Sequence, residues 1–412
     1  MTGTLQKDRY SWVYSVRGLE KDFGIMEFFA HYSRLRAWML TWLGLAMTPF
    51  LMAEPLVYEG TSGFGRGKHI VFIANDHEYR SEQVCPALAK IMAYRYGFKC
   101  TVIFGLDETG AIMAGAPDMP GTEALADADL LFFATRFMNL PDEQVQPLVD
   151  YFERGGPTVG IRTSTHCFNG QEGKWAKLNF NFEGSDYLGG LGEQIYGNTW
   201  HKDRGQSHYG SNHRMGARID GVSTAIDHPI LTGVGSIHAY SGAYLSRPPV
   251  GSTPLLEVQV LNTFEPSDDI NTEKPIVNAG WTRDHYVAPS GSRQDARVAY
   301  ASYGTSEDLL DEDARRFLIN ASLWALGMET HIEADLDVDI VGGFDPLAYC
   351  TGMYYKGVKP HDLAGADSRI MPADAELAGL DQERVIRRLP AVLMHRPELA
   401  ARIKRTHPEL VK

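Results

Sequence analysis

The sequence predicts an α/β fold in which a mostly parallel central sheet is covered by helices on both faces. Short apolar runs alternate with segments of helical period between residues 69 and 161. The apolar runs are continuous, as in parallel strands that are buried on both faces. The composition, 44% hydrophobic and 22% charged residues over 412 positions, is that of a globular protein with a sizeable core.

The first half of this pattern resolves into four strands and two helices. Val84, Leu88 and Ile91 recur on one face of a helix expected over Ser81–Tyr96. A second helix is expected over Pro141–Arg154, because proline suits a first helical position and Gly155 suits the residue after the end. The strands are expected over His69–Ala74, Lys99–Phe104, Asp129–Ala134 and Pro157–Ile161.

The second half begins with a long insert, Phe168–Val234, which is rich in Gly, Asn, His and aromatic residues and has weak periodicity. Inserts of this kind in a compact domain commonly form lids or binding loops. A helix is expected over Glu312–Leu326, an aromatic loop over Phe344–Leu363 and a helical tail over Asp374–Lys412. The remaining strands are expected over Ala239–Leu245, Pro254–Val260, Pro275–Ala279 and Ala296–Tyr303.

The N-terminal region has the features of a secretory signal. Arg34 and Arg36 precede an uncharged run, residues 37–53, that ends in a small residue. The run is about 17 residues long, at the lower limit for a membrane span. An uncleaved membrane anchor and a buried helix remain alternatives. We therefore expect export to the periplasm or the extracellular space, with residues 1–53 as signal, 54–67 as linker, 68–330 as the main domain and 331–412 as a C-terminal extension.

Charge and cysteine content limit the classes of partner. The formal net charge of -13 argues against nucleic acid, which requires a basic surface to meet its phosphates. The four cysteines form no CxxC pair and show no zinc-finger spacing. Scattered core thiols are the simpler interpretation, and a bridge between Cys85 and Cys100 remains open if the protein is exported.

Polar segments follow three of the expected strands: Asn75–Arg80, Thr135–Arg136 and Arg162–His166. Because the carboxyl ends of parallel strands lie on one edge of a sheet, these segments are expected to converge there. Their arginines suit an oxygen-rich or anionic ligand. The structural alternative is that strand ends simply meet polar turns, with Asp76 or Ser81 capping the next helix.

Two further groups in the second half could contribute to a site. His201, His208 and His213 lie in the insert, and two of them with His166 could form a metal site, for example for zinc. Their spacing matches no zinc signature, and ordinary loop histidines are the alternative. Trp281 and Arg283 follow an expected strand and could form a substrate-binding wall, although a core tryptophan beside surface charges fits equally well.

The chain resembles the trehalose-utilisation (ThuA-like) family of the class I glutamine amidotransferase-like superfamily. The tail FDPLAYCTGMYYKGVKPHDL at 344–363 resembles the extension of exported bacterial members. The motifs that carry the resemblance are DHEYRSE at 76–82, TRF at 135–137, GGPTVGIRT at 155–163, GQSHYG at 205–210, DHPI at 227–230, AGWTR at 279–283 and YGTSEDLLDEDARRFLINASLWALG at 303–327.

The resemblance implies a flavodoxin-like, class I glutamine amidotransferase-like three-layer sandwich and a role in carbohydrate metabolism. In true amidotransferases a catalytic cysteine follows the strand that corresponds to Pro157–Ile161, and here Arg162 stands in that place. Glutaminase chemistry needs an activated thiolate at this position. Cys167 lies too far along the chain to replace it directly. The sequence therefore argues against glutamine amidotransferase activity.

Together these observations predict an exported protein that acts on a sugar or an oxidised glycoside, as a hydrolase, lyase or isomerase if it is an enzyme. The alternative is a glycan-binding or structural module on the same fold. Either would take a small carbohydrate as its ligand. The candidate catalytic residues are His166, His208, Glu78 and Asp76, and the candidate substrate-binding residues are Arg136, Arg162, Thr163, Trp281 and Arg283.

Overall fold

The computed structural model describes residues 55–371 except 202, 204, 210–214, 264, 350, 351 and 353, together with 375, 377, 378, 401, 404, 405 and 408. A ten-stranded sheet runs through this part of the chain in the order β1-β3-β2-β4-β5-β14-β11-β10-β7-β8. The neighbours from β3 to β14 pair in parallel, and the strands beyond them pair antiparallel. The predicted α/β class with a mostly parallel central region is confirmed.

The parallel region alternates strands with helices along the chain. Its strands are β2 (His69–Asn75), β3 (Lys99–Phe104), β4 (Leu130–Thr135), β5 (Thr158–Ile161) and β14 (Val298–Ala301). The long helices are α2 (Ser81–Tyr96), α3 (Asp142–Glu153) and α5 (Glu312–Ala325). The side chain of Asp311 caps α5 by accepting a hydrogen bond from the backbone N–H of Ala314 at 3.0 Å.

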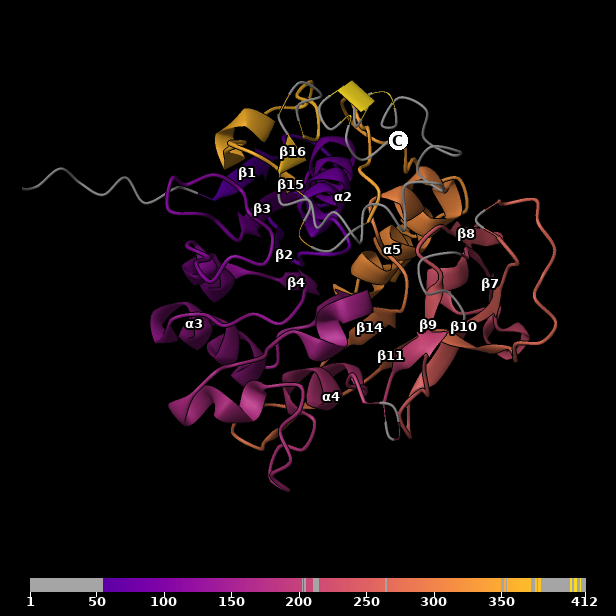
Figure 1. Cartoon of the computed structure of the whole chain (residues 1–412), viewed down its shortest axis with the longest axis horizontal. Coiled ribbons are helices and arrows are strands. Elements are labelled where there is room, and N and C mark those ends of the chain that lie inside the picture. The colour runs from indigo at the N-terminus through magenta and orange to yellow at the C-terminus, as the bar shows by residue number, and fades with distance from the viewer. Residues whose placement is uncertain are drawn as a thin grey trace, which may run out of the picture. The chain divides into compact units, whose positions relative to one another are not determined.

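The antiparallel region comprises β7 (Ala217–Gly221), β8 (Ile237–Ala239), β10 (Thr253–Val260) and β11 (Val277–Arg283), and β1 (Leu56–Glu59) pairs at the opposite edge. In Figure 1, β1 to β4 lie on one side of α5, and β7, β8 and β10 lie on the other. Short elements complete the chain: α4 (Gly190–Tyr196), the pair β6 (Ser207–Tyr209) and β9 (Ala243–Leu245), the pair β12 (Tyr286–Val287) and β13 (Arg293–Gln294), and the pair β15 (Tyr354–Tyr355) and β16 (Leu377–Ala378).

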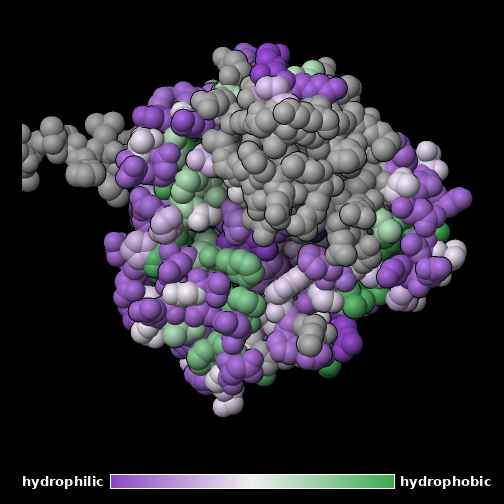
Figure 2. Space-filling view, in the orientation of Figure 1, coloured by the Kyte–Doolittle hydropathy of each residue, from purple (hydrophilic) through white to green (hydrophobic). Residues whose placement is uncertain are grey.

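Alternation of side chains along the parallel strands builds two hydrophobic cores, one on each face of the sheet. In β2, Ile70 and Phe72 belong to the core beneath α2 and α5, whereas Val71 and Ile73 belong to the core beneath α3 and α4. The result is a three-layer arrangement. In the coloured part of the face shown in Figure 2, hydrophobic residues lie interspersed among hydrophilic ones.

The expected elements of the first half agree with the structure to within one residue at each end. Three expected strands in the second half were wrong in their bounds, and one of them, Ala296–Tyr303, is shorter by two residues at each end as β14. The run Ala239–Leu245 is interrupted at Gly242, whose φ of 64° turns the chain, so that its two ends form β8 and β9 in different sheets. The strand expected over Pro275–Ala279 starts later and continues to Arg283 as β11. The insert is also more regular than expected, because it contains α4, β6 and β7.

Several sequence-based predictions fall on residues that the structure does not describe: the signal or anchor at 37–53, His213, Cys350 and most of the tail Asp374–Lys412. Within the described part, no helix has the length and apolar character needed to cross a membrane. Cys85, Cys100 and Cys167 are buried and free, so the alternative of a Cys85–Cys100 bridge was wrong.

The C-terminal extension packs against α2. Leu347, Val358 and Leu363 join the core on the α2 face of the sheet. Gln83 of α2 binds the extension through both ends of its amide: Nε2 donates to the carbonyl of Asp345 and Oε1 accepts from the N–H of Leu347. A buried lysine, Lys90, adds a third attachment.

Replacing Lys90 by methionine is expected to loosen this attachment. The ammonium group of Lys90 donates to the carbonyls of Ala366 and Ser368 and to the hydroxyl of Ser368. Losing one buried donor leaves such acceptors unsatisfied, at a cost of about 1–3 kcal/mol each. Limited proteolysis of folded protein should therefore cut the segment 342–371 faster in Lys90→Met than in the wild type.

The exposed Lys274 provides the matched control, since Lys274→Met removes a lysine that lies away from the extension. Equal cleavage rates in Lys90→Met and Lys274→Met would mean that Lys90 does not hold the extension.

Burial also lowers the pKa of Lys90 to about 8. Because the unfolded chain binds this proton more tightly, the Lys90 contribution to stability should rise with pH between about 8 and the ordinary lysine value.

Candidate functional site

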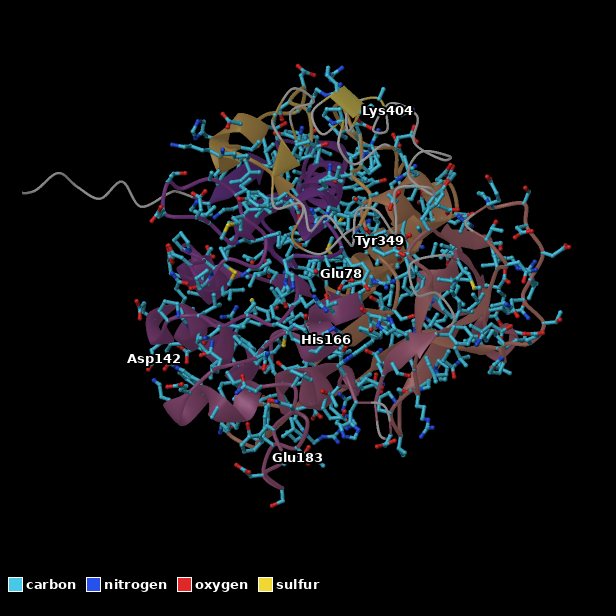
Figure 3. All side chains as sticks on the ribbon, viewed as in Figure 1. Glu78, Asp142, His166, Glu183, Tyr349 and Lys404 are labelled. Carbon is cyan, nitrogen blue, oxygen red and sulfur yellow. The ribbon has the colours of Figure 1, made fainter. Side chains whose placement is uncertain are left out.

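The polar segments predicted to converge do meet at the carboxyl edge of the parallel strands. The hydroxyl of Thr163, after β5, donates to Oδ2 of Asp76, after β2. Arg136, after β4, forms an ion pair with Glu78 in which Nη2 and Oε2 are 3.1 Å apart. Figure 3 shows Glu78, His166 and Tyr349 toward the middle of the molecule, while Asp142 and Glu183 lie at its margin.

Asp76 and Thr163 hold the segments together. Oδ1 of Asp76 accepts hydrogen bonds from the backbone N–H groups of Glu78 and Tyr79, which shapes the turn after β2. Oδ2 is held by Thr163. Because the whole carboxylate is engaged by the protein and the side chain is buried, the geometry gives Asp76 a structural role rather than the predicted catalytic one. Thr163, buried and donating to Asp76, likewise supports the backbone rather than the predicted ligand.

Arg162 sits at the sharp turn directly after β5, with a φ of 40°. Its guanidinium is sandwiched between the rings of Tyr79 and Tyr244, at 3.9 and 4.6 Å from their centroids. Nη1 contacts the hydroxyl of Ser241 at 2.8 Å and the carbonyl of Ser302 at 3.1 Å.

Ser241 in turn donates to the carboxylate of Asp308 at 2.6 Å, which supplies a buried counter-charge for Arg162. With 3% of its surface exposed, Arg162 is turned into the protein. The geometry therefore favours a structural role over the predicted substrate-binding one, because the guanidinium holds the turn directly after β5.

Arg136 is the arginine of the edge that remains partly exposed, with 20% of its side chain accessible. Nη1 lies 2.9 Å from Nε2 of His77, and Nη2 pairs with Glu78. Arginine can only donate, so Nε2 of His77 accepts and the His77 ring is neutral. Burial lowers the pKa of His77, in agreement with this state. Since guanidinium carries five N–H groups, Arg136 retains donors for a ligand oxygen while Glu78 balances its charge.

His166 is enclosed by aromatic rings. The centroids of Trp200, Phe137 and Tyr244 lie 5.2, 5.3 and 6.0 Å from that of the His166 ring. Burial lowers the pKa of His166 well below its ordinary value, and the positive charges of Arg136 and Arg162 lower it further. The imidazole is therefore neutral near pH 7 and can accept a proton.

His208 lies near this aromatic group but does not complete a metal site. Its ring is 4.9 Å from that of Trp200, and burial lowers its pKa as well. His201 instead accepts a local hydrogen bond from the N–H of Asp203 at 3.3 Å. In the described ranges, no group of three or more His, Cys, Asp or Glu could hold a metal ion. His166, His201 and His208 thus do not form the predicted three-ligand centre.

Trp281 and Arg283 lie apart from this edge, within β11. The indole of Trp281 is fully buried and donates to the carbonyl of Tyr196 at 2.9 Å. Nη1 of Arg283 donates to the carbonyls of Gln194 and Ile195. Both side chains thus hold α4, which fits the alternative of a core tryptophan better than a substrate-binding wall.

The side chains that enclose the edge were not indicated by the sequence. Tyr79 stacks on Tyr349 of the C-terminal extension, with centroids 5.4 Å apart. Trp200 and Tyr244 come from the insert and the strand that follows it. Only the richness of these segments in aromatic residues pointed to them, and that signal does not say which rings meet.

Gly192 of α4 is packed directly on the backbone after β5. A Cβ built there would lie 1.9 Å from the carbonyl oxygen of Thr165. Gly192→Ala is expected to displace α4 and lower the free energy of unfolding by about 1–3 kcal/mol, although alanine favours the helix itself. Urea denaturation measures the change. In Gly221→Ala, the control, the new Cβ meets its nearest neighbour at 3.4 Å. If both variants unfold at the same urea concentration, α4 does not buttress the turn.

No protein-family model and no curated protein matches the sequence. Among solved structures, the chain is similar to one described as a ThuA-like protein from Parabacteroides merdae, with 15% identity and a TM-score of 0.36. The match covers 63% of this chain and 90% of that one.

Proposed function

We propose that the protein is an enzyme of carbohydrate metabolism that acts on an oxidised glycoside, with His166 as the proton acceptor. The observation that carries this proposal is a neutral, buried imidazole enclosed by aromatic rings and close to a partly exposed arginine, Arg136. A histidine of this kind is suited to removing a proton from carbon, and the arginine to stabilising the negative charge that develops on oxygen.

The charge balance of the edge favours an uncharged ligand. Glu78 offsets Arg136, and the pKa values of His77, His166 and His208 are all lowered, so these rings are neutral near pH 7. Aromatic side chains combine an apolar face with a polar edge, which suits a sugar ring that has apolar C–H faces and hydroxyl groups around its rim. The arginines alone suggested an oxygen-rich or anionic ligand. The charge balance and the aromatic side chains together favour a neutral sugar.

The chemistry follows from the position of a ring ketone. For the anomeric oxygen to leave by elimination, the carbonyl must stand at C3 of the sugar. His166 takes the proton from C2, the electron pair of that C–H bond forms a C2=C3 double bond, and the carbonyl electron pair moves onto the C3 oxygen, where Arg136 donates to it. The C3 carbonyl then re-forms, the C2=C3 electron pair shifts to form a C1=C2 double bond, and the C1–O bond breaks. The departing alcohol oxygen keeps the electron pair of the C1–O bond and receives the proton from His166. The products are an unsaturated keto sugar and the free alcohol.

The proposal includes export, which is supported by the apolar run at 37–53 after Arg34 and Arg36. A test of the function is incubation of the purified protein with a panel of glycosides and their C3 ketones, with analysis of the products. We expect the alcohol to be released from the C3 ketones and not from the parent glycosides. Binding without product across the panel would instead support the alternative of a glycan-binding module.

The pH dependence of activity provides a separate prediction. A neutral histidine acts as the base, so kcat/KM should fall on the acid side as His166 becomes protonated. Because burial and the neighbouring arginines lower this pKa well below 6.5, the acid limb should also lie well below 6.5. The acid limb of kcat/KM is measured from initial rates on a reactive ketone between about pH 4 and about pH 8, roughly two units on either side of the ordinary histidine pKa. A limb centred at or above 6.5 would contradict the assignment of His166.

A further inference from the structure

A row of buried hydrogen bonds ends at His166. It starts at the carbonyl oxygen of Arg162 and passes through the hydroxyl of Tyr300, the amide of Gln206 and the hydroxyl of Thr165 to Nδ1 of His166. All three intervening side chains are fully buried. None of them is a residue that the sequence indicated as catalytic.

The first member of the row, the carbonyl of Arg162, determines which atom donates in each of the hydrogen bonds that follow. The carbonyl of Arg162 can only accept, so the single hydroxyl proton of Tyr300 points to it over 2.7 Å. The Tyr300 oxygen must then accept from Gln206, which places Nε2 of that amide toward Tyr300 at 2.8 Å. The other proton of Nε2 reaches the hydroxyl of Ser246 at 2.9 Å. Oε1 of Gln206 is thereby left as an acceptor facing Thr165.

The same logic continues to the imidazole. The hydroxyl of Thr165 donates to Oε1 of Gln206 at 2.6 Å, and the Arg162 carbonyl at 3.3 Å is also a pure acceptor. Tyr300 contacts Thr165 as well, but its proton is already given to the Arg162 carbonyl, so it too can only accept from Thr165. The only hydroxyl proton of Thr165 is therefore used in each case, so the Thr165 oxygen can only accept from Nδ1 of His166, 3.1 Å away. Nδ1 must carry the proton of the neutral ring.

We propose that Thr165, Gln206 and Tyr300 are positioning residues that hold His166 in the tautomer protonated at Nδ1. Nε2 then carries the lone pair, and no residue that the structure describes forms a hydrogen bond with it. This inference rests on the proposed function, since it identifies Nε2 as the atom that accepts the substrate proton. Gln206 belongs to the insert, so the proposal gives that segment a part in positioning His166.

Nuclear magnetic resonance of the substrate-free protein tests the tautomer without reference to activity. The protein is labelled with ¹³C and ¹⁵N in its histidines, and the His166 signals are identified by their loss in His166→Asn. The expected result at pH 7 is a neutral ring with the proton on Nδ1. A neutral ring protonated at Nε2, or an even mixture of tautomers, would overturn the proposal.

Two variants at Thr165 separate positioning from packing. Thr165→Val keeps the shape but removes the acceptor, so the His166 signals should shift toward the other tautomer and kcat should fall by on the order of tenfold or more with KM little changed. Thr165→Ser retains the hydroxyl and should restore both. If the tautomer is as expected but no glycoside ketone reacts, the proposed function is wrong and the positioning of His166 is still supported. If Thr165→Val keeps the wild-type tautomer, the proposed positioning of His166 is wrong.

Discussion

We expect the His166→Asn variant to lose kcat/KM by about 10²- to 10⁴-fold on any C3 ketone that the wild type converts. Asparagine preserves a polar side chain of moderate size, but it has no nitrogen that can accept a proton. The remaining activity would come from Arg136, which can still donate to the carbonyl oxygen. Steady-state rates of alcohol release for the two proteins measure the loss.

His361 provides the matched control for this substitution. It lies in the C-terminal extension, with 75% of its side chain exposed beside Asp362. His361→Asn should retain wild-type kcat/KM. A His166→Asn variant that folds, as shown by circular dichroism and an unchanged urea midpoint, yet keeps its activity would remove His166 from the reaction.

The second large effect is expected at Arg162, on stability. Arg162→Met would leave Asp308 buried with no opposing cation and would take the donor from Ser241 and Ser302. Each buried acceptor left without its donor costs about 1–3 kcal/mol, and Asp308 also loses the favourable charge of Arg162. Loss of the cation–π contacts with Tyr79 and Tyr244 adds to it. The urea midpoint of unfolding should fall accordingly.

The matched control is Arg293→Met, at an exposed arginine whose partner is the equally exposed Asp295. Its effect should stay within about 0.5 kcal/mol, as for most surface positions. An Arg162→Met variant as stable as this control, but with a raised KM, would restore the substrate-binding role that the sequence suggested. The stability of Arg162→Lys should lie between those of Arg162→Met and Arg293→Met, since an ammonium keeps the charge but cannot stack between two rings.

The fold could be predicted largely because its signals are local. Continuous apolar runs mark β2 to β5, and the helical period of Val84, Leu88 and Ile91 marks α2. The same pattern also predicted which edge of the sheet carries the polar segments, since parallel strands have their carboxyl ends at one edge. The chain reversal at Gly242 was marked only by the turn dipeptide Ser241-Gly242, which lies inside an otherwise continuous strand-like run.

The roles of individual side chains at the edge depend on contacts that are distant in sequence. Arg162 looked like a ligand for substrate, but its partner Ser241 lies 79 positions away, and only folding shows that the guanidinium turns inward. Arg136 carries the same chemistry after a neighbouring strand and stays partly exposed. Gln206, which fixes the His166 tautomer through Thr165, lies in a segment without periodicity, so no pattern could assign its role.

The most direct test of the account is the fate of the hydrogen at C2. A glycoside ketone carrying deuterium at C2 should react more slowly than the unlabelled compound, and the deuterium should pass to solvent in the wild type. Neither reaction nor exchange should occur at a comparable rate in His166→Asn. Retention of the label in the released sugar, or equal exchange by the His166→Asn variant, would contradict proton removal by His166.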